Sequence, residues 1–306
     1  MKQIVQRLLQ AVLVLFGVAL LLFIMVRVIP GNPVAMMMGD HADPAAIERI
    51  SHELGLDRPI HEQFFIYLRN VLRLDFGTSI TLGRPVADLM TAAFPNTLKL
   101  AVCAAVFAWV TGIFCGIISA AYSNSFIDHL FMGISLLGLS MPVFLIAMVL
   151  QYVFAYHLHI LPISGTDSWK SFVLPAIALG WNCAGSVARL MRSSLLEVME
   201  EDYIDTAYAK GRSHAGVLIF HALRNAFLPV VTMMAVQFSA LISGAVITET
   251  VFSINGIGRL AAAAINGRDI PLLQGTVLFS TLAAVLGNLL ADWLYLLLDP
   301  RITEAI

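Results

Sequence analysis

Apolar residues in this sequence gather in six blocks, each long enough to cross a lipid bilayer. A helix needs about 20 apolar residues to span a hydrocarbon core of about 30 Å. Because the bilayer offers no water to backbone N–H and C=O groups, such blocks are expected to be helices. The blocks are Leu9–Ile29, Leu98–Ala121, Phe131–Ala155, Phe172–Ala188, Phe227–Val246 and Leu272–Leu298. The sequence therefore predicts an all-α integral membrane protein with six transmembrane helices.

The composition agrees with a chain that lies mostly in lipid. Hydrophobic residues make up 59% of the 306 residues and charged residues only 12%, whereas soluble domains usually carry about 25% charged residues. The net charge of −2 gives no indication of a nucleic-acid partner. Cys103, Cys115 and Cys183 lie inside predicted spans without a CxxC pair, so we expect neither a disulfide framework nor a zinc site.

Both ends of the chain are expected in the cytoplasm. Lys and Arg accumulate in cytoplasmic loops, and an N-terminus inside places most Lys and Arg of the tails and short loops on that side. The first block is too long for a signal peptide and no cleavage site follows it, so we expect a retained anchor. The chain then divides into a tail and first helix (1–29), an external helical element (30–96), a transmembrane core (97–300) and a cytoplasmic tail (301–306). In the external element, Asp43-Pro44 and Pro59–Leu72 predict two short helices.

A charged stretch at about 195–229 separates the fourth and fifth spans. Its apolar residues recur every fourth position and predict a stripe on one helix face: Leu195, Met199, Tyr203 and Ala207. Gly211 is typical of a helix end, and a second short helix follows it. Such a helix–turn–helix could dock to a cytoplasmic partner or lie on the lipid surface. The pattern alone leaves both interpretations open.

Part of this stretch resembles a known motif. Asp205-Thr206-Ala207-Tyr208-Ala209-Lys210-Gly211 resembles the EAA loop of ABC importer permeases, with Asp205 in place of Glu and Thr206 in place of the first Ala. The segment His221–Pro229 resembles the branch that imports dipeptides, oligopeptides, nickel and glutathione. Further matches lie along nearly the whole chain, at Pro30–Pro33, Leu54–Pro59, Asp75–Gly77, Arg268–Pro271 and Leu298–Arg301. One departure is Asn255, where the family usually has Pro.

The resemblance implies a coupling helix that sits in a groove of a separate ATPase subunit. The residues assigned to this contact are Tyr203, Asp205, Thr206, Ala207, Gly211 and Arg224. The small Ala207 and Gly211 would permit close approach. ATP and Mg would bind in two partner ATPase subunits and this chain would hold no cofactor, in keeping with its lack of a GxxxxGK[ST] loop. A homologous second permease and an external solute-binding protein would complete the assembly, and element 30–96 would contact the binding protein.

Polar or helix-breaking residues within the spans are candidates for the translocation path. Asp292, with Asn288 one turn before it, could line the pore or anchor a neighbouring helix by hydrogen bonding. Glu249 at the outer end of the fifth span could lie near the substrate path or simply be solvated at the membrane surface. Met141 and Pro142 are expected to bend the third span.

Small residues in two spans predict close helix packing without identifying the partner helices. They are Gly112 and Gly116 in the second span, and Ser239 and Ser243-Gly244 in the fifth.

Metal and enzymatic sites are not expected. Met36–Met38 with His41, and His157 with His159, offer soft donors, but three adjacent Met residues do not share a helix face and no carboxylate completes a cluster. His52-Glu53 and His61-Glu62 begin like HExxH but lack the second His, and no GxSxG elbow appears.

These features together predict a multi-pass permease subunit of a bacterial-type ABC importer in the inner or plasma membrane. It would form half of a pore for dipeptides or oligopeptides. Import of nickel, of a metal–chelator complex or of glutathione remains an alternative within the same architecture. An energy-independent channel is the alternative from another class.

Overall fold

The computed structural model describes residues 2–28, 45, 48, 51–52, 57–243 and 245–298. Five helical segments in these ranges are long and apolar enough to cross a membrane: Gln6–Arg27, Val86–Ala121, Trp169–Met199, Ala215–Ser243 and Ile270–Ala291. A sixth span results if the bent pair Phe126–Ser140 and Val143–His157 counts as one. The expected all-helical fold is confirmed, with no named strand in the described part of the chain.

The chain divides into two compact units, Met1–Pro95 with Gly256–Leu282, and Asn96–Asn255 with Ala283–Ile306. The first unit contains α1 (Lys2–Val28), α4 (Ile60–Leu72), the start of α5 (Val86–Ala121), α13 (Ile257–Asn266) and the start of α14 (Ile270–Leu298). Helix α4 confirms the expected helix from Pro59 to Leu72, whereas the residues around Asp43-Pro44 lie mostly outside the described ranges. Helix α5 begins at Val86, ten residues before the predicted end of the external element at Asn96, so the last part of that element is helical and continuous with the second span.

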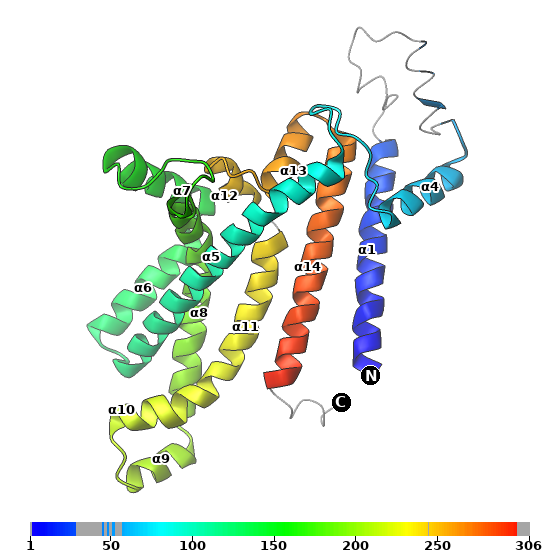
Figure 1. Cartoon of the computed structure of the whole chain (residues 1–306). Helices are drawn as coiled ribbons and strands as arrows, with labels where there is room; N and C mark the ends of the chain where they lie inside the picture. Colours follow the sequence, from blue (N-terminus) through cyan, green and yellow to red (C-terminus); the bar gives the residue numbers. More distant parts are fainter. Residues whose placement is uncertain are drawn as a thin grey trace. The chain divides into compact units, whose positions relative to one another are not determined.

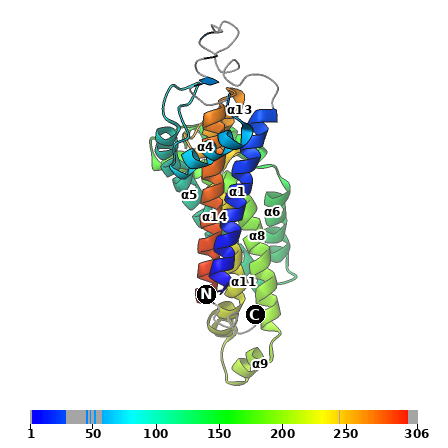
Figure 2. The same cartoon turned by 90° about the vertical axis from the view of Figure 1, so that its right-hand side faces the viewer.

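Within the first unit, aromatic and polar contacts hold α4 against α1 (Figure 2). The rings of Phe23 and Phe64 lie edge to face with centroids 5.1 Å apart. Arg27 donates a hydrogen bond from Nε to Gln63 Oε1 at 3.1 Å, and its guanidinium lies 4.1 Å from the centre of the Phe23 ring. The Arg27 guanidinium at the end of α1 therefore has both a hydrogen-bond acceptor and an aromatic ring as partners within the protein.

A carboxylate fixes the loop before α5 to the start of α14 in the same unit. Asp269 is fully buried. Its Oδ2 accepts hydrogen bonds from Ser79 Oγ at 2.6 Å and from Thr81 Oγ1 at 2.8 Å, and its Oδ1 accepts one from the Leu272 amide at 3.1 Å. Burial alone would raise the pKa of Asp269, but these hydrogen bonds lower it below its usual value.

The second unit is built around α8 (Val173–Met199), with α5, α6 (Phe126–Ser140) and α11 (Leu223–Ser243) beside it (Figure 1). Helix α7 (Val143–Leu150) continues as a π-helix, η1 (Gln151–His157), and a short 3-10 turn, η2 (Trp169–Phe172), leads into α8. Helix α8 ends at Met199, so the predicted fourth span, Phe172–Ala188, is extended and Arg189–Met199 continues the same helix. Helix α11 ends at Ser243, and Glu249 lies on a separate short helix, α12 (Val246–Val251).

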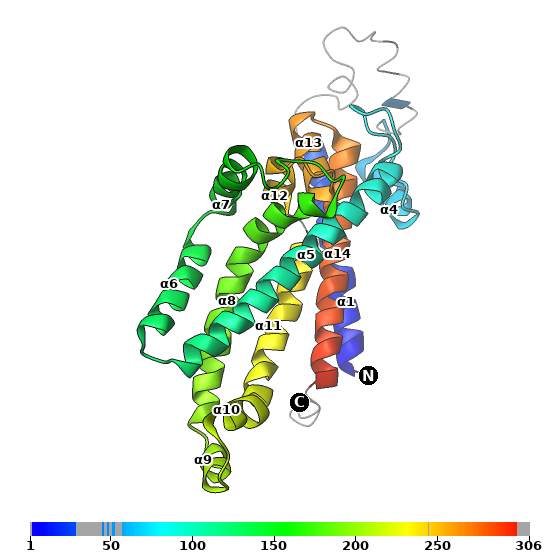
Figure 3. The same ribbon diagram turned by 60° about the vertical axis from the view of Figure 1, so that its left-hand side comes forward.

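The third span is bent by 109° between α6 and α7 (Figure 3). Met141 and Pro142 lie between the two helices. Proline has no N–H to donate to the preceding turn, so the first helix ends there. The expected bend at Met141 and Pro142 is confirmed.

The small-residue pairs pack helices together within this unit. A Cβ added at Gly112 would lie 2.7 Å from Val187 Cβ, and one at Gly116 would lie 2.6 Å from Met191 Cβ, so the partner of the GxxxG face is α8. Ser239 on α11 donates a hydrogen bond to the Ala284 carbonyl of α14 at 2.9 Å. Gly244 lies outside the described residues.

Candidate coupling site

The coupling segment follows α8 after only two residues. Helix α9 (Asp202–Ala209) leads through a turn to α10 (His214–Val217) and then to a π-helical turn, η3 (Leu218–Ala222), which enters α11. Figures 1 and 3 place α9 at the end of α8 that is remote from α7 and α12. The expected stripe from Leu195 to Ala207 does not lie on one helix, because the helix breaks at Glu200 and Glu201.

Negative charge and a glycine define the two ends of α9. Asp202 and Asp205 lie in its first turn, where a carboxylate interacts favourably with the helix dipole. Gly211 has a φ of +78° and its N–H donates to the Tyr208 carbonyl at 2.9 Å. Because this left-handed conformation costs other residues about 1–2 kcal/mol, glycine suits the helix end.

One face of α9 is buried against the protein itself. Ile204 has no exposed surface and Ala207 is 6% exposed. Both belong to a cluster, here called the α9 cluster, with further members on α5, α8, α10, η3 and α11. Its buried residues are Ala120, Val187, Met191, Leu195, Ile204, Ala207, Val217, Ala222, Ala226 and Val230. Ala207 therefore packs inside this chain, and its close approach to an ATPase subunit stays a prediction.

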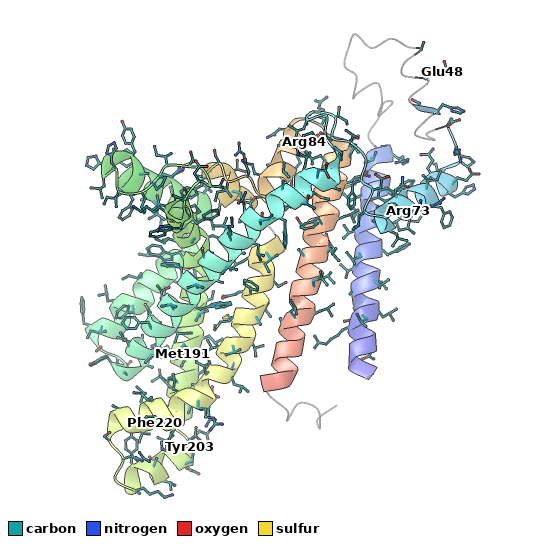
Figure 4. All side chains as sticks on the ribbon, viewed as in Figure 1. Glu48, Arg73, Arg84, Met191, Tyr203 and Phe220 are labelled. Atoms are coloured by element: carbon teal, nitrogen blue, oxygen red, sulfur yellow. The ribbon has the colours of Figure 1, made fainter. Side chains whose placement is uncertain are left out.

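The other face of α9 is exposed and polar. Asp202, Asp205, Thr206, Ala209 and Lys210 are exposed, and so are Gly211 and Arg224. Tyr203 is 39% exposed, and its phenolic oxygen accepts a hydrogen bond from Asn225 Nδ2 at 2.7 Å. Figure 4 shows Tyr203 near Phe220 at this end of the unit. Five of the six predicted coupling residues are thus exposed, on α9, in the turn that follows it and at the start of α11: Tyr203, Asp205, Thr206, Gly211 and Arg224.

The predicted pore residues occupy different elements. Glu249 is fully buried on α12 and its Oε1 accepts a hydrogen bond from Thr97 Oγ1 at 2.7 Å, which contradicts simple solvation at the membrane surface. Met141 is half-buried and Pro142 is exposed at the bend. Asn288 is exposed on α14, and the side chain of Asp292 lies outside the described residues.

Among the residues that the structure describes, the candidate metal-binding side chains do not come together in a site. His157 and His159 are exposed, and the described residues contain no group of three or more His, Cys, Asp or Glu that could hold a metal ion. Met36–Met38 and His41 lie outside the described residues.

Sequence reasoning missed a buried ion pair. Asp128 on α6 is 3% exposed and pairs with Arg192 of α8 through two hydrogen bonds, from Nε at 2.7 Å and from Nη2 at 2.6 Å. Arg192 entered the sequence argument only as a cytoplasmic positive charge. The partners are 64 positions apart, so no local spacing could have joined them.

Two family models of transport proteins match most of the chain. Residues 112–304 match the family described as "Binding-protein-dependent transport system inner membrane component", and residues 1–101 match "Binding-prot-dependent transport system membrane comp, N-term". The protein belongs to this family of inner-membrane permease subunits of ABC importers. In such systems ATP hydrolysis takes place in separate subunits, and a partner permease and a substrate-binding protein complete the transporter.

Curated relatives and a solved structure agree with this assignment. The chain is 40% identical over 302 residues to the glutathione transport system permease protein GsiC of Escherichia coli K12, covering 99% of both chains. It has the same identity and coverage with GsiC of Shigella flexneri serotype 5b. An inward-facing structure of the MetNI methionine ABC transporter aligns with a TM-score of 0.60 at 15% identity, covering 69% of this chain and 96% of that one. The structural match supports the fold alone.

Proposed function

We propose that this chain forms half of a translocation pore for small peptides, with tripeptides of the glutathione type included. A homologous permease supplies the other half, an external binding protein delivers the solute, and two ATPase subunits bind ATP and Mg. Helix α9 sits in a groove of one ATPase subunit. This chain binds no cofactor of its own.

The two faces of α9 carry this proposal. A helix that lies on lipid turns an apolar face to the membrane. Here the apolar residues Ile204 and Ala207 pack inside the protein, while Asp202, Asp205 and Lys210 are exposed. A charged, accessible face on a firmly packed helix fits a protein partner better than a lipid surface. If α9 meets an ATPase, it lies in the cytoplasm, and six spans then place both chain ends there as well.

The name of the curated relatives supports glutathione and peptides over nickel as the solute. The candidates for the path through the membrane remain Glu249, Met141, Pro142, Asn288 and Asp292. Since Glu249 and Thr97 form a buried hydrogen bond, we expect Glu249 to shape the path by holding α12 against α5.

Uptake by the complete transporter tests the solute and the energy source together. The two permeases, the ATPase subunits and the binding protein are reconstituted in vesicles, and labelled glutathione, a labelled dipeptide and nickel are offered separately, with and without ATP. We expect ATP-dependent uptake of glutathione or dipeptide. Uptake of nickel alone would contradict the proposed solute, and uptake without ATP would show a channel.

A further inference from the structure

The Asp128–Arg192 pair lies where three helices meet. Asp128 also accepts hydrogen bonds from Ser119 Oγ near the end of α5 and, at 2.9 Å, from the Asn124 amide of the α5–α6 turn. Arg192 reaches it from α8. We call Ser119, Asn124, Asp128 and Arg192 the α5–α6–α8 clamp.

The geometry of the clamp makes it a rigid connection. A guanidinium that donates two parallel hydrogen bonds to one carboxylate fixes both distance and orientation. The Asp128 side chain is 4% exposed and the Arg192 side chain 26% exposed, so water competes little for these bonds. Removal of either charge would leave the other without its partner in a largely dry site.

Helix α8 carries both the clamp and the support of α9. Met191 and Leu195 on α8 are fully buried in the α9 cluster with Ile204 and Ala207, and Arg192 directly follows Met191. Close packing of Gly116 on Met191 joins α5 to α8 one turn before Ser119. Helix α9 packs on η3, and η3 packs on α8. The turn of α8 around Arg192 therefore contributes apolar residues to the α9 cluster and its guanidinium to the α5–α6 turn.

The far end of α6 leads to the bend. Gly185 on α8 packs on the Ser135 carbonyl, and Gly138 packs on the Trp181 ring, so α6 follows α8 up to Met141. Helix α7 then packs on both α8 and α12. Packing contacts through α8 and α7 therefore connect α6 with α12, which carries the buried Glu249.

We propose that Asp128 and Arg192 are positioning residues for coupling, which join α9, α8 and the α5–α6 turn into one moving body. This inference rests on the proposed function, in which an ATPase moves α9. The clamp would convert that displacement into movement of α6 and of the bend at Met141 and Pro142. Without the clamp, α9 and α8 would still move, but α6 would follow them less.

The test measures solute imported per ATP hydrolysed by the complete reconstituted transporter. For Asp128→Asn and Arg192→Gln we expect continued ATP hydrolysis and a ratio lowered about tenfold, within the range by which residues between two sites alter their coupling. Arg192→Lys keeps the charge but loses the paired geometry, and should give an intermediate ratio. Arg189→Gln is the matched control, because Arg189 is exposed one turn earlier on α8; its ratio should be unchanged.

A purely structural role would lower import and hydrolysis in proportion, and an unchanged ratio would overturn the proposal. An equal fall in Arg189→Gln would overturn it too. If the charge variants do not assemble, Ser119→Ala, which removes one hydrogen bond, should still lower the ratio measurably, and no change there would contradict the clamp. A wild-type transporter that imports no solute with ATP would instead count against the proposed function.

Discussion

Asn225 donates a hydrogen bond to the phenolic oxygen of Tyr203 at 2.7 Å, and this bond joins α9, the proposed coupling helix, to the first turn of α11. Ile204, the next residue, is fully buried in the α9 cluster. Helix α9 is thus held by an apolar contact and a polar contact from adjacent residues. A short helix of eight residues, which would be unstable alone, keeps one orientation for this reason.

Loss of the Tyr203 hydroxyl should loosen α9 slightly. For Tyr203→Phe we expect a loss of about 0.5–1.5 kcal/mol of stability, the usual net value of one hydrogen bond, and weaker retention of the ATPase subunits on purification. Thermal unfolding and co-purification measure the two effects. Tyr122→Phe, at an exposed tyrosine on the α5–α6 turn, is the control and should change neither.

Gly211 should tolerate only residues that accept a positive φ. Nothing lies within 4 Å of a Cβ added there, so the penalty for Gly211→Val comes from the backbone and should be at least about 1–2 kcal/mol. Gly211→Asn should be close to wild type in stability. Gly211→Trp adds bulk to the accessible surface and should abolish ATPase binding; normal ATPase binding by this variant would contradict docking at this turn.

Two alanines on α9 should respond differently to the same substitution. Ala207→Leu overfills the α9 cluster and should cost about 1–3 kcal/mol of stability. Ala209→Leu lies on the exposed face and should leave thermal unfolding unchanged while it weakens ATPase binding. Melting curves combined with ATPase co-purification separate the two, and equal destabilisation by both would show that the faces are assigned wrongly.

Substitution by alanine should lower the stability at one glycine in α5 and raise it at another in α6. At Gly116 a Cβ would lie 2.6 Å from Met191 Cβ, so Gly116→Ala must separate α5 from α8 and should lower the melting temperature. At Gly133 no atom lies within 4 Å, and alanine should stabilise α6 by up to about 1 kcal/mol. A higher melting temperature for Gly116→Ala would contradict the close packing.

Asp269 should make the first unit sensitive to acid. Its folded pKa is lower than the unfolded value of about 3.9, so its stabilisation is complete above that value and is lost as the pH falls through the folded pKa. The difference in melting temperature between wild type and Asp269→Asn should be constant from neutral pH to about pH 5 and should shrink below about pH 4. Asp88→Asn, at an exposed carboxylate, should show a much smaller difference, and a gap that widens on acidification would contradict the hydrogen-bonding pattern.

The apolar blocks predicted the approximate position of five spans and of the bent pair that would make a sixth, because the need to satisfy backbone groups in lipid acts on any sequence. Met141 and Pro142 likewise predicted the bend, which follows from the missing N–H of one residue. Helix ends were predicted less well. Helix α8 runs past Ala188 to Met199, because Met191 and Leu195 are buried in the α9 cluster, a tertiary contact that hydropathy does not register.

The sequence predicted which segment forms the candidate coupling surface, but not which side of α9 is exposed. The motif placed Ala207 beside Asp205 and Thr206, and only the packing of α9 shows that Ala207 turns inward. The Asp128–Arg192 pair and the Asp269 hydrogen bonds join residues far apart in sequence, so they depend on the tertiary fold. The spacing of residues in the sequence therefore does not reveal that these charged groups are buried.

A cysteine scan of residues 202–210 tests the central claim most directly. Single cysteines are introduced after replacement of Cys103, Cys115 and Cys183, and cross-linking to the ATPase subunit is measured in the assembled transporter. We expect cross-links from positions 202, 205, 206 and 209, which are exposed, and none from 204 and 207, which are buried. Equal cross-linking at 204 and 207, or none at any position, would contradict docking of the ATPase on the exposed face of α9.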